Sequence, residues 1–169
     1  MSTTPHPPLQ PRRELGRTGF VATAIGIGDL ADLSVSLEAC VATLHRAMDY
    51  GLNLIDTAPM YEDGYSEQIV GEALRRAFGG ELARATGRDD IFVIDKIDDL
   101  DAPVGPQADA SLQRLGLDHV DLFVLHGLST LAGWVASNVL AETRLAATRP
   151  PTGRSDGRVR LAGRDWRWL

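Results

Sequence analysis

The stretch Gly51-Leu-Asn-Leu-Ile-Asp-Thr-Ala-Pro-Met-Tyr61 decides the fold. Its segment 52–56 is a short run that is apolar on both faces, as expected of a strand buried inside a parallel sheet. The run ends on Asp56, and Tyr61 follows five residues later in a loop. In parallel α/β folds, ligands bind beyond the carboxyl ends of the strands, so this stretch predicts both a sheet and the edge that carries its site.

The segments around this stretch alternate between strand and helix patterns. A hairpin with a Gly-containing turn is expected over 13–23, and further strands over 24–28, 91–94 and 120–125. Helices are expected to begin at Ser34 or Ser36, at Ser66 and at Asp109, and to end near glycines 51, 79 and 116. This alternation predicts an α/β fold with a parallel sheet and right-handed crossovers.

Polar side chains accompany three successive expected strands at their carboxyl ends. Asp56 ends the second strand, Lys96 follows the third and His126 ends the fourth, so we expect them to meet beside Tyr61. Taken singly, each has an ordinary structural explanation: a capping Asp, a solvated Lys, a satisfied His and a packed Tyr. Lys96, however, is the single lysine in a chain with 16 arginines. Unlike the guanidinium of an arginine, the ammonium of a lysine can release its proton at accessible pH. The convergence indicates a functional site.

Length and composition bound the protein class. The chain has 169 residues and a net charge of -6, which fits one domain with a core but is short of the about 250 residues of a complete eight-stranded β/α barrel. The single cysteine, Cys40, excludes an internal disulfide and is expected to be a buried apolar residue of a cytoplasmic protein. No apolar run approaches the roughly 20 residues of a membrane span. Residues 1–140 carry 10 basic and 20 acidic side chains, which argues against nucleic acid as a partner.

The two ends of the chain lack this regular pattern. Residues 1–12 are rich in Pro and Thr and are expected to be a disordered arm. Residues 129–169 hold 7 of the 16 arginines and all three tryptophans, and 133–169 has no clear strand pattern. Out-of-frame reading of GC-rich DNA would give such a tail. The rival interpretation is a genuine short protein that pairs two half-barrels.

Several ordered motifs, from about residue 13 to residue 128, resemble the aldo-keto reductase family. The stretch 51–61, with Ser66-Glu67 and 71–74, is similar to the signature after that family's second strand. Segment 13–19 resembles its opening hairpin, 92–96 its lysine strand, and 110–126 its fourth unit. The resemblance implies a partial (β/α)8 TIM barrel, with the first four βα units preceded by an N-terminal β-hairpin.

The resemblance also implies a reaction and roles for residues. The family transfers hydride between NADP(H) and an aldehyde or ketone, so the expected substrate is a small carbonyl or alcohol compound. Tyr61 would donate the proton, Lys96 would help because a nearby ammonium favours a phenolate, and Asp56 would pair with Lys96. His126 would orient the substrate carbonyl. No metal is expected.

Gly28, Asp29 and Asp56 are the implied cofactor contacts, although 28–30 departs from the family's more usual Gly-Thr-Trp type of turn. A second tyrosine, Tyr65, lies near Tyr61, but the spacing from Asp56 favours Tyr61. The family's later cofactor-binding motifs are not visible after residue 128, so a truncated reductase is expected, with barrel edges open to self-association.

Two alternatives remain open at this point. One is a non-catalytic fragment or gene remnant with a half-barrel fold. The other is a Rossmann-type dinucleotide-binding domain, since 26–31 fits the loose pattern G-x-G-x-x-A and Asp56 would be its ribose-binding acid.

Overall fold

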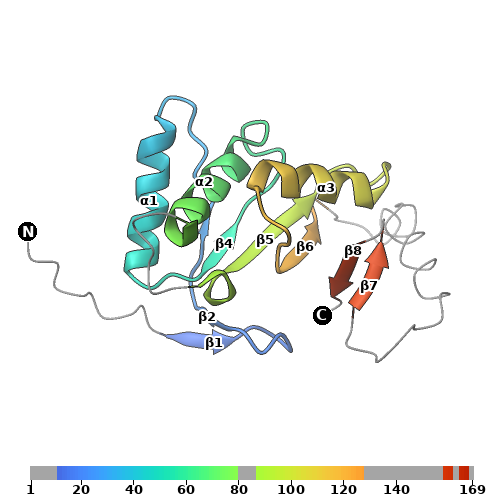
Figure 1. Ribbon diagram of the computed structural model, residues 1–169, viewed down its shortest axis with the longest axis horizontal. Coiled ribbons are helices and arrows are strands. Elements are labelled where there is room, and N and C mark those ends of the chain that lie inside the picture. The colour runs from blue at the N-terminus through green and yellow to red at the C-terminus, as the bar shows by residue number, and fades with distance from the viewer. Residues whose placement is uncertain (1–10, 80–86, 128–157, 162–163, 168–169) are drawn as a thin grey trace, which may run out of the picture.

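The computed structural model describes residues 11–79, 87–127, 158–161 and 164–167. A β-hairpin comes first and is followed by strands that alternate with helices (Figure 1). The elements are β1 (Arg12–Glu14), β2 (Val21–Thr23), β3 (Ile27–Gly28), α1 (Leu37–Asp49), β4 (Leu54–Asp56), α2 (Tyr65–Gly79), the 3-10 turn η1 (Arg88–Asp90), β5 (Phe92–Ile97), α3 (Val104–Leu115), β6 (Leu122–Leu125), β7 (Arg158–Leu161) and β8 (Arg164–Arg167).

The central sheet has the order β3-β4-β5-β6, and each neighbouring pair is parallel. The helices α1, α2 and α3 run side by side along this sheet (Figure 1). Strands that follow each other in sequence are therefore also neighbours in space, as in the first part of a parallel β/α barrel. This confirms the predicted parallel α/β arrangement preceded by a hairpin.

All four strands of the central sheet differ in their bounds from the prediction, and β4 and β6 begin two residues later than expected, at Leu54 and Leu122. The strand expected over 24–28 is reduced to Ile27–Gly28, because Ala24 still pairs with the hairpin through a hydrogen bond to the oxygen of Pro11. The strand expected over 91–94 extends to Ile97, so Lys96 lies within β5 rather than after it. The polar pair 95–96 masked the end of this strand in the sequence.

The helices begin and end for identifiable local reasons. The hydroxyl of Ser36, not Ser34, caps α1 by accepting from the N–H of Ala39, and Gly51 follows the helix with a φ of 84°. Helix α3 begins at Val104 rather than at Asp109, five residues earlier than predicted. Pro106 is accepted in its first turn, where a missing N–H removes no helical hydrogen bond.

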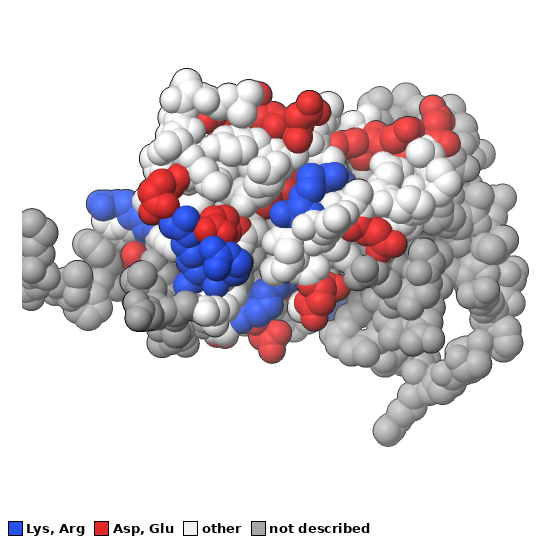
Figure 2. All heavy atoms as spheres, turned by 45° about the horizontal axis from the view of Figure 1, so that its top comes forward, with Lys and Arg blue, Asp and Glu red and all other residues white. Residues whose placement is uncertain are grey.

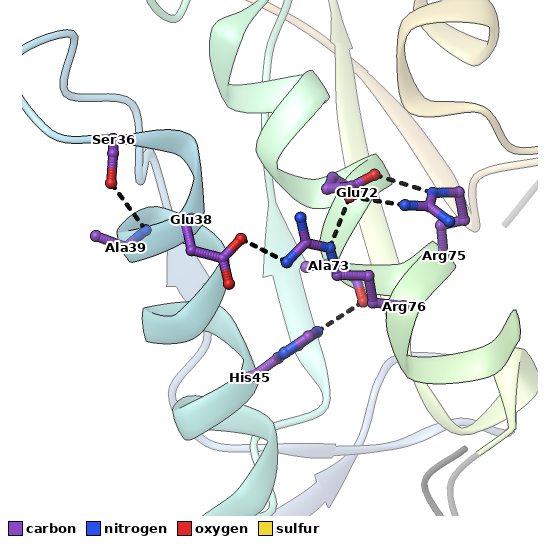
Figure 3. A network of polar contacts seen from close by, with 8 residues as sticks. All are labelled: Ser36, Glu38, Ala39, His45, Glu72, Ala73, Arg75 and Arg76. Atoms are coloured by element: carbon purple, nitrogen blue, oxygen red, sulfur yellow. Dashed lines mark hydrogen bonds and ion pairs between the residues drawn. The ribbon is translucent and has the colours of Figure 1, made fainter. Parts of the chain in front are cut away.

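Helices α1 and α2 are joined by polar contacts (Figure 3). The Nε2 atom of His45 lies 2.8 Å from the oxygen of Ala73, and Arg76 reaches both Glu38 and Glu72 at 2.6 Å. Glu72 also accepts from Arg75, and these two guanidinium groups lower the pKa of Glu72 to about 2. On the face shown in Figure 2, basic side chains lie beside acidic ones rather than forming a broad basic surface.

The core lies between these helices and the sheet. Its buried members include Leu44 of α1, Leu74 of α2, Val93 of β5 and Leu115 of α3, and Cys40 is buried among them as predicted. Helices α2 and α3 approach closely at Gly71, where an added Cβ would lie 2.3 Å from the oxygen of Leu115. The apolar faces predicted from helical spacing therefore meet in one core.

The hairpin is attached to the sheet by a buried amide. The Oδ1 atom of Asn53 accepts from the N–H of Thr23 at 2.8 Å, and its Nδ2 donates to the oxygen of Val21 at 3.0 Å. Asn53 precedes β4 and is 8% exposed. The Arg12 guanidinium of β1 also donates to the oxygen of Gly51 at 2.7 Å, so side-chain hydrogen bonds join the hairpin to the segment that precedes β4.

The tail departs from its prediction in one respect. Segments 158–161 and 164–167 form the antiparallel pair β7–β8, so the expectation of no strand over 133–169 is wrong there. The sequence Arg158-Val-Arg-Leu161 alternates polar and apolar residues with the period of a strand, a signal too short to stand out. The rest of that tail, and the predicted disordered arm up to residue 10, lie outside the described residues. Among the described residues, no helix has the length and apolar character needed to cross a membrane.

Candidate active site

The site begins with an ion pair between two neighbouring strands. Asp56 at the end of β4 lies opposite Ile94 of β5, and Lys96 is two residues further along β5, on the same face of the sheet. The Nζ atom of Lys96 donates to Oδ1 of Asp56 at 2.5 Å and to the oxygen of Thr57 at 2.7 Å. Lys96 is 8% exposed, so its ammonium is held by charge-assisted bonds in a nearly dry setting.

Tyr61 lies over this ion pair. Its ring centroid is 4.8 Å from Nζ of Lys96, a cation–π distance. The loop then turns into α2 through three successive residues with positive φ: Glu62, Asp63 and Gly64. The alternative tyrosine, Tyr65, is on α2, and its hydroxyl donates to the oxygen of Val35 at 3.4 Å. Tyr61 is therefore the tyrosine beside the lysine.

His126 is the fourth member of this group. It comes directly after β6, where its N–H donates to the oxygen of Ile97 at 3.0 Å. Its ring meets that of Tyr61 edge to face, with centroids 5.6 Å apart and an interplanar angle of 84°. The structure thus brings Asp56, Tyr61, Lys96 and His126 together at the carboxyl edge of the sheet.

The two remaining predicted site residues lie next to Asp56. Gly28 pairs with Asp56 in the β3–β4 ladder, and an added Cβ there would lie 3.4 Å from Cβ of Asp56. Asp29 follows with a φ of 42°. Both are exposed, and their role as cofactor contacts stays a prediction. No cluster of three or more His, Cys, Asp or Glu residues suited to a metal ion occurs in the part of the chain that the structure describes.

A second acidic group lies on the other face of β5, behind the site. Asp95 is fully buried, and its Oδ1 accepts from the N–H of Lys96 at 2.8 Å. Burial, together with the nearby Glu67 carboxylate, raises the pKa of Asp95 to about 7. Glu67 of α2 is itself fully buried and is paired with Arg114 of α3.

Sequence reasoning missed two side chains that support the site. One is Asp95. The other is Asp98, whose Oδ1 lies 2.6 Å from Nδ1 of His126. A signal for Asp98 was available: it stands two residues after Lys96, and alternate residues of a strand share a face. The signal was obscured because the strand was predicted to end before Lys96.

The fold and the site together define a class of protein: a partial parallel β/α barrel with an Asp-Tyr-Lys-His group at the carboxyl edge of its strands. A family model described as the aldo/keto reductase family matches residues 23–130, more than half of the chain. The chain belongs to the aldo/keto reductase family.

Relatives and solved structures agree with this assignment. The chain is 34% identical over 124 residues to the NADH-specific methylglyoxal reductase of Escherichia coli. This match covers 66% of this chain and 38% of that protein. It is 40% identical over 97 residues to methylglyoxal reductase YeaE of the same species, covering 54% and 30% respectively. An aldo-keto reductase from Klebsiella pneumoniae in complex with NADPH superposes with a TM-score of 0.57 and 29% identity, covering 75% of this chain and 42% of that one.

The extent of these matches is partial. The chain spans 38% and 30% of the lengths of the two E. coli relatives. A second family model, described as type II secretion system protein I, matches residues 128–169, most of which lie outside the described residues.

The Rossmann-type alternative is not supported. The described sheet has a sequential strand order without the reversal at which dinucleotides bind in doubly wound folds, and α1 begins only at Leu37, well after Gly28.

Proposed function

We propose that this chain carries the proton-transfer half of an NADP(H)-dependent reductase site for small aldehydes or ketones. The observation that carries the proposal is the Lys96 ammonium, bound by Asp56 and lying 4.8 Å from the ring of Tyr61. A positive charge beside a tyrosine ring stabilises the negative charge that develops on the phenol oxygen while its proton is being transferred. The hydroxyl of Tyr61 can then pass its proton to a substrate oxygen and regain it from solvent.

Each of the four residues has a separate task in this proposal. Asp56 and the oxygen of Thr57 hold the Lys96 ammonium in place. Tyr61 donates the proton, and His126, whose ring meets that of Tyr61 edge to face, orients the substrate oxygen. Bound NADP(H) supplies the hydride for reduction or accepts it in the reverse oxidation.

The residues next to the ion pair fit a nicotinamide nucleotide. The Asp56 side chain keeps 40% of its surface exposed although Lys96 is bound to it, so its carboxylate is open to a ribose hydroxyl. Gly28 beside it has no side chain to obstruct the approach. The choice of NADP(H) over NADH rests on the NADPH complex of the Klebsiella structure, since the first E. coli relative is named NADH-specific.

The test uses the full chain with NADPH and methylglyoxal, a substrate suggested by the names of the E. coli relatives. NADPH binding is measured by fluorescence titration and reduction by the loss of NADPH absorbance. Tyr61→Phe should lower the rate by about 10² to 10⁴ while leaving NADPH binding unchanged. Tyr65→Phe is the matched control, because its hydroxyl bonds Val35 and should not affect the rate.

Two outcomes contradict the proposal. Retained turnover in Tyr61→Phe would remove the tyrosine from the reaction. Failure of the folded chain to bind NADPH would instead favour the non-catalytic fragment. Lys96→Arg should also lower the rate, since the planar and bulkier guanidinium does not fit the compact place of Nζ between Asp56 and the oxygen of Thr57.

A further inference from the structure

Asp98 occupies a place in the site to which no role has been assigned. It is the first residue after β5, two positions beyond Lys96, so both side chains leave the sheet on the same face. Its Oδ1 atom lies 2.6 Å from Nδ1 of His126, and the two side chains are 23% and 22% exposed. The contact joins the carboxyl ends of β5 and β6.

The His126 ring is held in this orientation from several sides. Its backbone N–H donates to the oxygen of Ile97, the residue immediately before Asp98. The ring of Tyr61 stands edge to face against it, and the Lys96 ammonium lies by that same tyrosine. Nδ1 is therefore bound to Asp98, which leaves Nε2 as the ring nitrogen able to meet a substrate.

The chemistry of a carboxylate fixes where the proton of this ring resides. An ionised carboxylate only accepts hydrogen bonds, so Nδ1 of His126 must be the donor. In a neutral imidazole the other nitrogen then carries a lone pair. We propose that Asp98 is a positioning residue that holds His126 in the Nδ1–H tautomer, so that Nε2 is an acceptor in the neutral ring and a donor only in the imidazolium.

This tautomer changes what His126 can do in the proposed reaction, and that consequence rests on the proposed function. In reduction, the carbonyl carbon would gain the hydride that bound NADPH supplies, the C=O π electrons would move to oxygen, and the oxygen would take one proton from Tyr61. Only the imidazolium of His126 can donate to that oxygen through Nε2–H. In the reverse direction, the neutral ring can accept a hydrogen bond from the hydroxyl of an alcohol. Asp98 thus makes the hydrogen bond between His126 and the substrate oxygen depend on the charge of the ring, while Tyr61 supplies the transferred proton.

Nitrogen-15 NMR of the histidine rings tests the tautomer directly and requires no cofactor. The full chain is labelled and recorded at a pH at which the rings are neutral. The chain has four histidines, and His45 supplies the opposite reference: its Nε2 faces the oxygen of Ala73 at 2.8 Å, and a carbonyl only accepts. His126 should show a protonated Nδ1 and an unprotonated Nε2, whereas His45 should show a protonated Nε2.

A variant series then assigns the effect to Asp98. Asp98→Ala should lower the Nδ1–H to Nε2–H ratio of His126 about tenfold or more, the equivalent of one hydrogen bond to a charged group. Asp98→Asn should restore part of the ratio, since its amide oxygen still accepts from Nδ1. Asp118→Ala is the matched control, because Asp118 contacts His119 in a similar way at 2.7 Å and this pair is far more exposed to solvent. It should leave the His126 signals unchanged.

Either of two results would overturn the proposal: a wild-type His126 with its proton on Nε2, or an unchanged ratio in Asp98→Ala. Unaltered His45 signals show in each variant that α1 and α2 remain packed, so a loss of folding is recognised. Because the tautomer is read without NADPH, it can be confirmed even when the chain proves not to be a reductase. Where turnover is present, Asp98→Ala should lower kcat more than it raises KM, since it acts through His126 rather than on binding.

Discussion

Replacing Asp95 with Asn should stabilise the protein at neutral and alkaline pH, although Asp95 adjoins the site lysine in sequence. Its carboxyl is fully buried between β5 and the helices, and its Oδ2 has no hydrogen-bond partner. Glu67 adds a second buried negative charge nearby, and burial with this repulsion raises the pKa of Asp95 to about 7. The ionised form of Asp95 is therefore disfavoured in the folded state.

The magnitude follows from the shift in pKa. The ordinary value is 3.8, so a folded-state pKa of about 7 is a rise of about 3 units, and each unit is worth about 1.4 kcal/mol. Because the folded pKa is raised, the favourable contribution is complete below pH 3.8 and is lost as the pH rises to about 7. The upper limit of that loss is ~4 kcal/mol. An amide at position 95 keeps the bond from the Lys96 N–H and does not ionise.

Urea unfolding at pH 4 and at pH 8 measures this difference. Asp95→Asn should be close to wild type at pH 4 and more stable by up to ~4 kcal/mol at pH 8. The matched control is Asp89→Asn, an acid-to-amide change at an exposed position that should leave the free energy of unfolding unchanged at both pH values. A variant that is less stable than wild type at pH 8 would refute the reasoning, because it would mean that the Asp95 charge is stabilised in the fold.

Three further predictions concern the packing of the elements, and urea unfolding measures each of them. Gly71→Ala should lower the free energy of unfolding by about 1–3 kcal/mol, because the added Cβ would meet the backbone of Leu115. The control is Gly79→Ala, where nothing lies within 4 Å of the added Cβ, and it should be neutral or slightly stabilising. Equal effects of the two changes would contradict the close approach of α2 and α3 at Gly71. Asn53→Ala should lower the free energy of unfolding by about 1–3 kcal/mol, because the buried N–H of Thr23 loses its acceptor. Amide hydrogen exchange should become faster in the hairpin. Unchanged exchange would show that other contacts hold the hairpin. Glu72→Gln should lower stability by less than about 1 kcal/mol at pH 7 and low salt. The loss should vanish as the pH falls from 4.5 to about 2, because the lowered pKa of Glu72 stabilises only the ionised form, and a loss that persists at pH 2 would exclude the ion pairs as its cause.

The sequence predicted the order of the elements and the meeting of four residues because those features follow from periodicity alone. Strands such as 52–56 are apolar on both faces, and parallel topology places their carboxyl ends on one edge. It did not predict that β5 includes Lys96, because the buried Asp95 beside it looked like the end of a strand. The Ser111 side chain and the Lys96 backbone N–H lower the cost of burying that carboxyl, and these groups come together only in the folded chain.

The errors in the helices and the tail have similar causes. Helix α3 begins before its apolar repeat does, since its first turn, Val104 to Gln107, precedes that repeat. Asp98 escaped notice because its partner, His126, is 28 residues away and is brought close only by the β5–β6 ladder. Contacts that depend on register between distant segments are the ones that a single sequence does not display. The expected roles of the four site residues and of Gly28 and Asp29 stay predictions until the variants are measured.

The rarity of lysine in this chain makes the site chemically addressable. Lys96 is the only lysine, so it provides the only side-chain amine in the whole protein. Acylating or reductively methylating reagents aimed at such amines can modify no other side chain of that type, and the pairing of Lys96 with Asp56 shields it. The rate of labelling at this one position would therefore report how accessible the Lys96 amine is, and protection by an added nucleotide would reveal occupancy without any measurement of turnover.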